Sequence, residues 1–391
     1  MSTHNYITLM DYLAVLPDPR DRRGCWYEWN YLVTVVAAAM LAGYQTYADM
    51  NAWAVRNGEE LIRALSPRRK QIPSTSTLRR TACGLDVVLL EEAVASYLQA
   101  LDSDDAAHGE IETVTGEPLY GQAVDGKTVR TASAYGKTVH LVSIVRHESG
   151  VSLNQTRVEG KLNEADAAKQ LLSEIPLSGT VTTMDALYTG RELAQQILND
   201  GGHYLMVVKA NQPTLYHDID LAFSALPPTT SDEKAFWAYE KHISQERSHG
   251  RFDYRCLEST TALNHYLQWP GIQQVLRRTR WHQHVRTGQS STHVRYAITS
   301  VSRDLAPLDQ IERLWRWHWT IENGTHYRRD VSFGEDRCRT RIGDAPQALA
   351  ALRNAMLGLI RLEGWESIPN AFRHFQANPQ HPLRFLGALS S

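Results

Sequence analysis

The sequence predicts an α/β protein built around a mixed β-sheet, with a helical domain before the sheet and a β-rich insertion within it. Three observations support this prediction. Apolar residues recur at helical spacing over the first hundred residues, strands and helices alternate between residues 118 and 208, and strand-like patterns return after residue 213. Alternation of strands with helices is typical of a sheet that contains parallel strands.

Composition indicates a globular protein of more than one unit. The 391 residues are 42% hydrophobic and 21% charged, which is enough apolar surface for at least one complete core. The longest apolar run, residues 31–44, is shorter than the roughly 20 residues of a membrane span, so we interpret it as a buried helix. The four cysteines form no CxxC pair, which indicates neither a zinc site nor a disulfide framework. Reduced thiols suit the cytoplasm, which is the location we expect.

Charge is unevenly distributed along the chain. The net charge is only -2, which argues against a protein that coats nucleic acid indiscriminately. Residues 102–117 carry six acidic side chains and no Lys or Arg, whereas residues 277–341 carry 13 Arg against seven Asp and Glu. A surplus of guanidinium groups suits bidentate contacts with phosphate, although it is equally typical of a solvated, salt-bridged surface.

Residues 1–101 predict a helical domain, and the acidic residues 102–117 predict a linker that follows it. Asn30 is expected to cap an Ala-rich helix. In PSTSTLRR, either Ser76 or Thr77 is expected to cap another helix that carries Arg79 and Arg80 in its first turns. This helix would suit a DNA-binding helix-turn-helix, while an ordinary bundle with basic loops explains the pattern equally well.

Residues 118–391 predict the main domain. Its expected elements are a strand over residues 118–125, strands from Thr138 and Val151, a helix capped by Asn163, a strand ending at Asp185, a helix closed by Gly201 and a strand over HYLMVVKA. Strand-helix-strand crossovers normally place their strands parallel and adjacent, so the fourth strand is predicted to lie beside the first, with Asp185 next to Asp125. This βββαβαβ order is a ribonuclease-H-like arrangement.

A long interval separates the second aspartate from a third acidic residue. Residues 213–304 predict a β-rich insertion, because several stretches within them alternate like strands. A helix that opens near Pro307 then carries Glu322, which lies 137 positions after Asp185 (322 minus 185). Binding and catalytic residues commonly lie in such long insertions and loops.

Asp125, Asp185 and Glu322 are the candidate catalytic residues and metal ligands. Cleavage of a phosphodiester needs an activated nucleophile and a counter-charge for the leaving oxygen, and two divalent ions about 4 Å apart supply both. Carboxylates are suitable ligands for Mg²⁺ or Mn²⁺. An aspartate that ends a strand is often only a turn former, but Glu322 shares a predicted helix face with Trp315 and Trp319, where an unpartnered acid would be costly.

At this level of detail the chain resembles the DDE insertion-sequence transposases, in particular the branch that contains the H-repeat-associated proteins of Rhs elements. The resemblance covers nearly the whole chain. It is carried by the order of DPRDRRG, AVDGKTVR, VHLVSIV, DALYT, YLMVVKANQPTL, HGRFDYR, WPGIQQV, YAITS, HWTIENGTHYRRDVSFGEDRCRTR and ALRNAMLGLIRLEG. By resemblance, Asp125, Asp185 and Glu322 are the catalytic metal ligands, and the residues before Thr115 form the helical domain associated with this transposase type.

The chain departs from the wider clan around the glutamate. The clan signature is Tyr, two residues, Arg, three residues, Glu, six residues and Lys; here those places hold Trp315, His318, Glu322 and Arg329. Histidine would be charged only part of the time near pH 7, so the phosphate contact of the clan arginine could pass to Arg316. The nearby Asp330, Glu335 and Asp336 are alternative third ligands, but Glu322 alone fits the clan spacing.

Several further side chains are candidates for contacts with DNA, and each also has a structural interpretation. Lys127 follows the first aspartate, and a loop after the fifth strand presents polar groups at the edge where such a sheet binds its ligand. The candidate DNA-binding residues are Arg79, Arg80, Lys127, Lys209, Asn211, Gln212, His249, Arg251, Arg316, His318 and Arg329. Trp269 and Trp281 would suit stacking on bases, although a tryptophan in a strand is more often part of a core.

The sequence therefore predicts a DNA transposase that cleaves insertion-sequence ends and transfers strands into target DNA with two Mg²⁺ or Mn²⁺ ions. We expect a bacterial, nucleoid-associated protein that acts as a homodimer on double-stranded DNA, with neither a membrane nor an organic cofactor. Two alternatives remain at this stage. One is a structure-selective nuclease of the same fold that cuts without joining, and the other is a non-catalytic, transposase-derived DNA-binding protein.

Overall fold

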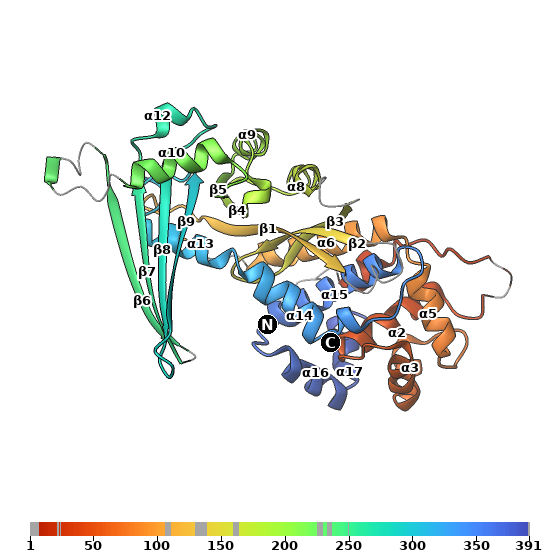
Figure 1. Cartoon of the computed structure of the whole chain (residues 1–391). Coiled ribbons are helices and arrows are strands. Elements are labelled where there is room, and N and C mark those ends of the chain that lie inside the picture. Colours follow the sequence, from red (N-terminus) through yellow and green to blue (C-terminus); the bar gives the residue numbers. More distant parts are fainter. Residues whose placement is uncertain are drawn as a thin grey trace. The chain divides into compact units, whose positions relative to one another are not determined.

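The computed structural model describes residues 8–21, 23, 25–105, 111–129, 139–158, 164–224, 230–232, 237–248 and 250–389 (Figure 1). The chain divides into two compact units. Unit 1 comprises Met1–Ala107, Gly126–Asn163 and Thr320–Ser391, and unit 2 comprises His108–Asp125 and Glu164–Trp319. Segments from both ends of the chain therefore share unit 1. No helix among the described residues is long and apolar enough to cross a membrane.

Unit 1 is mainly helical. Its N-terminal helices are α1 (Leu9–Leu13), α2 (Trp29–Leu41), α3 (Tyr47–Arg56), α4 (Gly58–Leu65), α5 (Thr75–Cys83) and α6 (Val87–Asp105). Its C-terminal elements are a π-helical turn, η3 (Ile321–His326), then α14 (Tyr327–Val331), the short η4 (Glu335–Arg337), α15 (Ala345–Leu362), α16 (Ile368–Ala377) and α17 (Gln380–Phe385). The helix α6 continues to Asp105 and so overlaps the start of the predicted linker.

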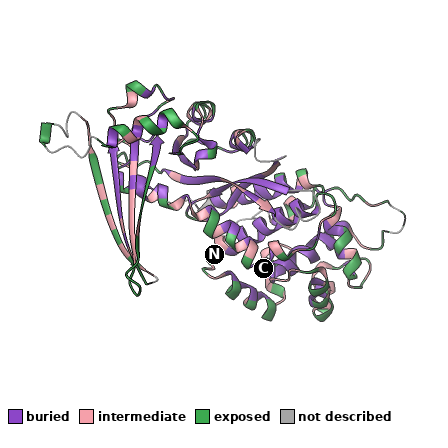
Figure 2. Ribbon diagram, viewed as in Figure 1, coloured by how far each residue is buried: buried purple, intermediate pink, exposed green. Residues whose placement is uncertain are grey.

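Two apolar helices form the centre of unit 1. Helix α15 is buried from Ala345 to Ile360 and packs against α6, α2 and α5, and α2 is buried almost throughout (Figure 2). A helix that is apolar on all sides is stable only when other elements surround it. Residues 31–41 of the apolar run thus lie in a buried helix, as the length of the run predicted, and residues 42–44 form the turn that follows.

Two of the expected helix caps are wrong. Helix α2 is capped by Glu28, so Asn30 lies in its first turn, and α5 is capped by Ser74, whose hydroxyl accepts from the Thr77 N–H. Ser74 is preferred because its extended backbone lets the side chain reach the free N–H of the third helical residue. The helix α13 opens next to Pro307, as expected, with Pro307 at its cap position. The proposed cap Asn163 lies outside the described residues.

A nine-stranded mixed sheet organises the rest of the chain. Its strands are β1 (Tyr120–Val129), β2 (Val139–Arg146), β3 (Ser152–Val158), β4 (Thr180–Met184), β5 (His203–Val208), β6 (Glu240–Ser248), β7 (Arg251–Thr260), β8 (Gln274–His284) and β9 (Ser290–Thr299). The strand order is β3-β2-β1-β4-β5-β9-β8-β7-β6. The strands β2 and β3 belong to unit 1, β1 runs through both units, and the other strands belong to unit 2.

The predicted βββαβαβ order is confirmed, and so is the key pairing. The helices α8 (Glu164–Ser173) and α9 (Arg191–Asn199) precede β4 and β5 respectively. Strand β4 pairs with both β1 and β5 in parallel, whereas β2 and β3 pair antiparallel. The crossover rule thus placed the fourth strand correctly beside the first.

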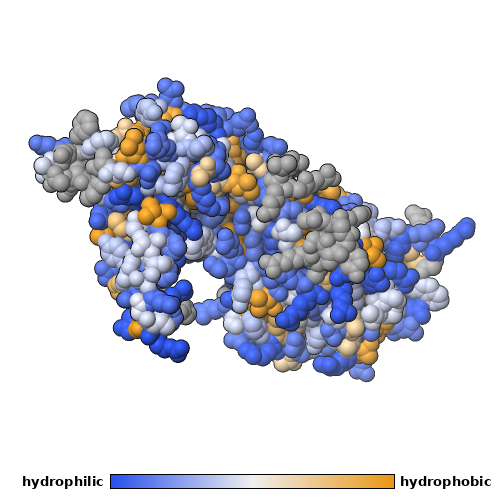
Figure 3. All heavy atoms as spheres, in the orientation of Figure 1, coloured by the Kyte–Doolittle hydropathy of each residue, from blue (hydrophilic) through white to orange (hydrophobic). Residues whose placement is uncertain are grey.

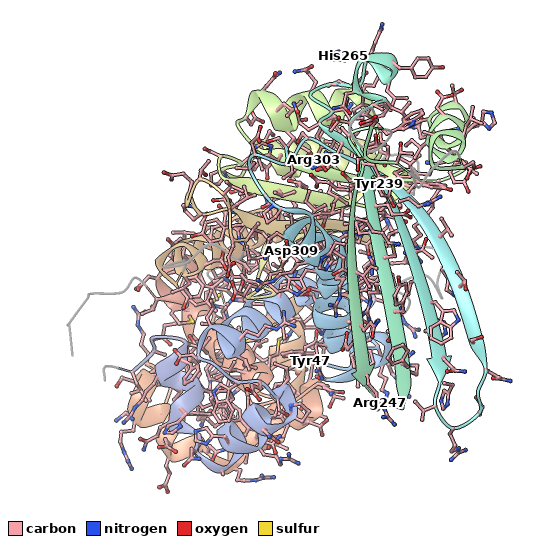
Figure 4. The ribbon with its side chains drawn as sticks, turned by 90° about the vertical axis from the view of Figure 1, so that its left-hand side faces the viewer. Tyr47, Tyr239, Arg247, His265, Arg303 and Asp309 are labelled. Carbon is pink, nitrogen blue, oxygen red and sulfur yellow. The ribbon has the colours of Figure 1, made fainter. Side chains whose placement is uncertain are left out.

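The region predicted as an insertion contains four antiparallel strands, β6 to β9, which we call the blade. Strand β9 pairs with β5, so the blade continues the central sheet of unit 2. Helices α10 (Pro213–Ser224) and α12 (Asn264–Leu267), which the sequence did not predict, lie at one end of the blade (Figure 1). Figure 4 shows Tyr239 and Arg303 toward that end and Arg247 at the opposite end.

The core of unit 2 lies where the blade meets β4, β5 and the helix α13 (Leu308–Trp317). Buried residues of these elements form one cluster that includes Val181, Leu205, Leu276, Ala297 and Trp315. Strands β7, β8 and β9 are buried at this end and become exposed toward the opposite end, whereas β6 has no buried residue along its length (Figure 2). The elements that carry the candidate aspartates are therefore held by a packed core.

Candidate active site

Asp125 and Asp185 lie side by side in unit 2. The parallel register pairs Val124 of β1 with Met184 of β4, so each aspartate comes one residue after this pair. Asp185 follows the last residue of β4, but Asp125 does not end its strand, because β1 continues to Val129. Adjacent parallel strands lie about 4.8 Å apart, so Asp125 and Asp185 are neighbouring residues at this level of the sheet.

Asp185 is held as a carboxylate by a lysine. The Lys209 Nζ, at the end of β5, lies 2.8 Å from the Asp185 Oδ2. Partial burial raises the pKa of Asp185, but hydrogen bonds from Lys209 and the Ala186 N–H and the charge of Lys209 outweigh it and hold the pKa below its ordinary value. A carboxylate that stays ionised near neutral pH is ready to bind a cation.

The KANQP loop braces the short turn that follows Asp185. The Asn211 Nδ2 donates to the Ala186 carbonyl at 2.7 Å, and the Gln212 Nε2 donates to the Thr189 carbonyl at 3.0 Å. The Thr189 hydroxyl in turn donates to the Val207 carbonyl of β5 at 2.6 Å. Amides that were candidates for DNA contacts thus fix the backbone beside the candidate ligand.

Two residues near the aspartates escaped the sequence analysis. The buried Tyr188 donates its hydroxyl to the Glu164 carboxylate at 2.8 Å. Burial raises the pKa of Tyr188 far above its ordinary value, and the charges of Glu164, Asp125 and Asp185 add to the effect. Tyr188 is therefore a neutral donor beside a group of carboxylates. Its position three residues after Asp185 in DALYT was the available signal, whereas nothing in the sequence pointed to Glu164.

His318 is a buried, neutral residue rather than a partly charged one. Its Nδ1 lies 3.0 Å from the Thr183 Oγ1, and the Thr183 hydroxyl also lies 3.1 Å from the Gln122 carbonyl, to which it donates. Burial lowers the pKa of His318 to about 4. The expectation of partial charge near pH 7 is therefore wrong, and a buried neutral imidazole cannot replace an arginine that contacts phosphate.

Glu322 lies in unit 1, within the π-helical turn η3 that follows α13. Its side chain is exposed, whereas Trp315 of α13 is buried. The expectation that Glu322 shares a face with Trp315 and Trp319 assumed a continuous α-helix, and it is wrong because a π-turn changes the angular spacing of successive residues. Single π-helical turns occur frequently at functional sites.

A buried charge cluster in unit 1 uses several of the other candidates. The Arg329 guanidinium, with no exposed surface, binds both carboxylate oxygens of Glu335 at 2.9 and 3.0 Å, and the Arg353 Nη1 lies 3.2 Å from Glu335. The Lys127 Nζ is also buried and lies 2.6 Å from the Asp330 Oδ2. In this structure Arg329 and Lys127 are therefore inaccessible to DNA, and the fully buried, doubly paired Glu335 is unsuited as a third metal ligand.

The alternative ligand Asp330 differs from Glu335. Burial raises the pKa of Asp330, Lys127 opposes this shift, and the charges of Asp336 and Glu335 favour it. A partly buried carboxyl whose pKa is raised binds metal less readily than an exposed carboxylate such as Glu322. The third alternative, Asp336, is partly exposed.

The remaining candidates for DNA contacts lie on several separate elements. Arg79 and Arg80 are exposed on α5, and Arg251 is exposed at the start of β7, next to Gly250 with a φ of 72° that a tight turn requires. The Arg316 Nη2 lies 3.0 Å from the Glu246 carboxylate. His249 lies outside the described residues.

Trp269 fits the interpretation as a core residue, and Trp281 fits it less well. Trp269 is buried under the Arg191 guanidinium, 5.0 Å from the ring centroid, which confirms the core interpretation. Trp281 is partly exposed in β8 and meets the Phe252 ring edge to face at 6.0 Å.

The donor set fits a divalent metal ion without forming a complete site. Asp125 and Asp185 supply two hard oxygen ligands at one point of unit 2, and Glu322 is exposed in unit 1. Among the residues that the structure describes, no group of three or more His, Cys, Asp or Glu side chains is arranged to hold a metal ion. The free cysteines Cys25, Cys83, Cys256 and Cys338 take no part in such a group.

Comparison with known proteins defines the class. The family described as "Transposase DDE domain" matches residues 117–359, and the family described as "DDE_Tnp_1-associated" matches residues 10–98. The chain therefore belongs to the DDE transposase family. Membership implies DNA as the substrate and divalent metal ions as cofactors.

Full-length relatives support the assignment. The chain is 26% identical over 362 residues to a protein of Escherichia coli O157:H7 named "Putative transposase YncI". The matched residues make up 90% of this chain and 87% of the relative. It is also 22% identical over 363 residues to the "H repeat-associated putative transposase YhhI" of Escherichia coli strain K12, with 90% of each chain covered. The resemblance to the H-repeat-associated branch is thus confirmed.

Proposed function

We propose that this protein is a DNA transposase that cleaves the ends of an insertion sequence and joins them to target DNA. The observation that carries the proposal is the placement of Asp125 and Asp185 at the same level of adjacent parallel strands in a chain that belongs to the DDE family. Two oxygen donors at one point of a sheet suit the binding of divalent cations. Neither an isolated strand-end aspartate nor an Arg-rich surface would have this specificity.

Asp125, Asp185 and Glu322 would hold two Mg²⁺ or Mn²⁺ ions. Such ions, when bound, activate an attacking oxygen and neutralise the leaving oxygen. In the first step a water oxygen bonds to phosphorus while the bond to the 3′ oxygen breaks, which leaves a 3′ hydroxyl. In the second step this hydroxyl attacks a target phosphodiester and releases another 3′ oxygen. Lys209 keeps Asp185 ionised for this role, and Asn211 and Gln212 hold the adjacent backbone.

The remaining parts of the proposal concern domains and partners. We assign residues 1–101 to a domain that contacts DNA, residues 102–117 to an acidic linker and residues 118–391 to catalysis. Arg79, Arg80, Arg251 and Arg316 are the accessible candidates for contacts with phosphate. Two element ends must be joined, so the active form is a homodimer on double-stranded DNA, and it works on the bacterial nucleoid in the cytoplasm.

The test is cleavage of a DNA fragment that carries the ends flanking the gene. Wild type is compared with Asp185→Asn, Glu322→Gln and the control Asp304→Asn, an exposed acid with no assigned role. We expect cuts at the ends that require Mg²⁺ or Mn²⁺, persist in the control and disappear in the two variants. Metal-dependent cutting that survives in both variants would refute the assigned ligands.

A supercoiled target plasmid added to the same reactions tests the joining step. Products in which an element end is covalently joined to the plasmid are expected for a transposase. Cutting without joined products would instead favour a structure-selective nuclease. Binding without any cutting would favour a DNA-binding protein that has lost catalysis.

A further inference from the structure

Two arginine-rich pockets of unit 1 share the helix α5. The first, pocket A, is a cavity of about 620 Å³ lined by Arg79 of α5, by Tyr47 (Figure 4) and by Arg337, Cys338 and Arg339 of the C-terminal segment. It joins parts of the chain that lie more than 250 positions apart (337 minus 79). Folding of unit 1 is what brings these three guanidinium groups together.

The second cavity, pocket B, has a volume of about 370 Å³. It is lined by Arg80 of α5 and by Arg20, Arg23, Trp26 and Arg69 from earlier segments. Trp26 is 66% exposed, and the Arg69 guanidinium lies over its ring at 4.1 Å from the centroid. An exposed tryptophan covered by a cation forms a flat, positively charged surface element.

Most of these arginines have no internal counter-charge. Arg20 binds Asp18 at 2.7 Å, and Asp21 also lines pocket B. Among the described residues no ion pair involves the other cations of the two pockets, namely Arg23, Arg69, Arg79, Arg80, Arg337 and Arg339. In the same unit, by contrast, the buried Glu335 pairs with two arginines. Unpaired guanidinium groups that converge on cavities suit a partner with several regularly spaced anionic groups.

The visible surface offers little support for a protein partner. Figure 3 shows apolar side chains scattered over a mainly hydrophilic face, without one large apolar patch. A stable protein interface normally has an apolar centre, whereas the backbone of DNA is recognised mainly through phosphates by Arg and Lys. The α5 arginines of the two linings, Arg79 and Arg80, are consecutive, so the two cavities lie close together, and a duplex carries closely spaced charges, one per about 1.7 Å of its axis.

We propose that pockets A and B, with α5 between their linings, form one site for the phosphate backbone of duplex DNA, independent of base sequence. This inference rests on the proposed function and assigns Arg23, Arg69, Arg337, Arg339 and Trp26 to DNA binding in addition to Arg79 and Arg80. Base-independent contacts of this kind fix the position of a protein on a duplex while other contacts read or cut it.

Each pocket is lined by one cysteine, so the rate of thiol alkylation measures whether the pocket is covered. Cys338 lines pocket A and Cys25 lines pocket B, while Cys256 is buried in β7 of unit 2. Burial opposes ionisation of Cys338, but the charge of Arg353 and hydrogen bonds with Thr340 prevail and lower the pKa of its thiol, which favours alkylation. The first experiment therefore follows alkylation of each cysteine by mass spectrometry, with the full chain in EDTA, with and without a 30-base-pair duplex of arbitrary sequence. We expect slower alkylation of Cys25 and Cys338 with DNA and no change at Cys256.

The second experiment measures affinity for the same duplex over a range of salt concentrations. We compare Arg79→Ala/Arg339→Ala in pocket A and Arg69→Ala/Arg80→Ala in pocket B with Arg373→Ala/Arg384→Ala, which removes two exposed arginines of α16 and α17. Each pocket variant should weaken binding. It should also reduce the slope of log affinity against log salt concentration by an amount that corresponds to about two phosphate contacts. The control pair should bind like wild type, and circular dichroism verifies that all variants fold.

The outcomes separate this inference from the proposed function. Unchanged affinity and salt dependence in both pocket variants, or unprotected thiols in a DNA complex, would overturn the two-pocket site and leave the catalytic proposal standing. Preference for double-stranded RNA of the same sequence, lost in the pocket variants, would overturn the assignment of DNA as the partner. Failure of wild type to bind any duplex would contradict the inference and the proposed function together.

Discussion

The Lys209 Nζ lies 2.8 Å from the Asp185 Oδ2, and the two side chains are 50% and 41% exposed. An exposed ion pair contributes little to stability, typically below about 1 kcal/mol. The pair is therefore better explained by its effect on the carboxylate, whose pKa lies below its ordinary value. Lys209 keeps Asp185 deprotonated and oriented before a metal ion arrives.

Replacing Lys209 with Gln should weaken metal use more than stability. Loss of the cation raises the pKa of Asp185, so protons compete better with the metal as the pH falls. We expect the Mn²⁺ concentration for half-maximal DNA cleavage to rise roughly 10- to 100-fold, as for other residues that orient metal ligands. The control is Lys169→Gln, which removes an ion pair with the exposed Glu192. Equal metal requirements in the two variants would contradict the role assigned to Lys209.

Asn211→Ala distinguishes a positioning role from a DNA contact. The Asn211 amide donates to the Ala186 carbonyl at 2.7 Å, so its loss should loosen the backbone next to Asp185. We expect the single-turnover cleavage rate to fall about 10-fold or more while DNA affinity, measured in EDTA, stays unchanged. Gln195→Ala, which removes an exposed amide pair on α9, is the control. A loss of affinity with a normal rate at saturating DNA would indicate direct DNA contact instead.

The buried His318 should make the protein sensitive to moderate acid. Its pKa is about 4 in the folded protein, against an ordinary value of 6.5, because burial disfavours the charged form. The unfolded chain therefore takes up the proton first, and the stability present above pH 6.5 is lost as the pH falls toward 4. Over that window the loss amounts to about 3 kcal/mol, at about 1.4 kcal/mol per unit of pKa.

Urea unfolding between pH 4 and 8 measures this contribution. The variant His318→Gln should be less stable at pH 7, because the contact with Thr183 is altered, but its stability should fall less steeply below pH 6.5. The exposed His217 of α10 provides the control His217→Gln, which should follow the wild-type curve. Parallel curves for wild type and His318→Gln would show that His318 titrates normally.

Glu335→Gln should strongly destabilise unit 1 at neutral pH. The carboxylate pairs with the buried Arg329 and Arg353, and removing one partner of a buried ion pair typically costs about 3–5 kcal/mol. Burial raises the pKa of Glu335, but the two arginines and Lys127 lower it below its ordinary value of 4.5. The contribution is therefore complete above pH 4.5 and disappears as the pH falls through the lower folded value.

The corresponding measurement is again urea unfolding, now from pH 3 to pH 7. The cost of Glu335→Gln should be largest at pH 7 and shrink below pH 4.5. Asp344→Asn removes an exposed pair with Arg157 at 3.2 Å and should cost less than about 1 kcal/mol. A cost of that small size for Glu335→Gln would show that the buried cluster contributes little.

The sequence was most informative where local patterns and chain topology decide the structure. Strand alternation and the crossover rule were sufficient to place Asp185 beside Asp125, because both depend on short stretches and on handedness. It was least informative about long-range pairing. The contact of Lys127 with Asp330, 203 positions apart, and the burial of Arg329 depend on how distant segments pack, and no local signal predicts them.

Local exceptions account for the other differences. The expected helix around Glu322 became a π-helical turn, and hydrophobic spacing at 3.6 residues per turn does not distinguish the two. Strand β1 continues beyond Asp125 because GKTV can occupy a strand as readily as a turn. The neutral state of His318 follows from its burial, which a histidine in a Trp-rich helix only partly indicates.

The pairing of β9 with β5 has a consequence for shortened versions of the protein. The register joins Leu205 to Thr299 and Val208 to Tyr296, so the last strand of the blade satisfies the backbone of β5. Excising residues 213–304 would remove this neighbour and leave the apolar strand LMVV with an open row of amide and carbonyl groups. Bare edges of this kind recruit other chains and aggregate. If such a deletion inactivated the protein, aggregation alone could explain the loss, and the result would not show that the blade recognises DNA.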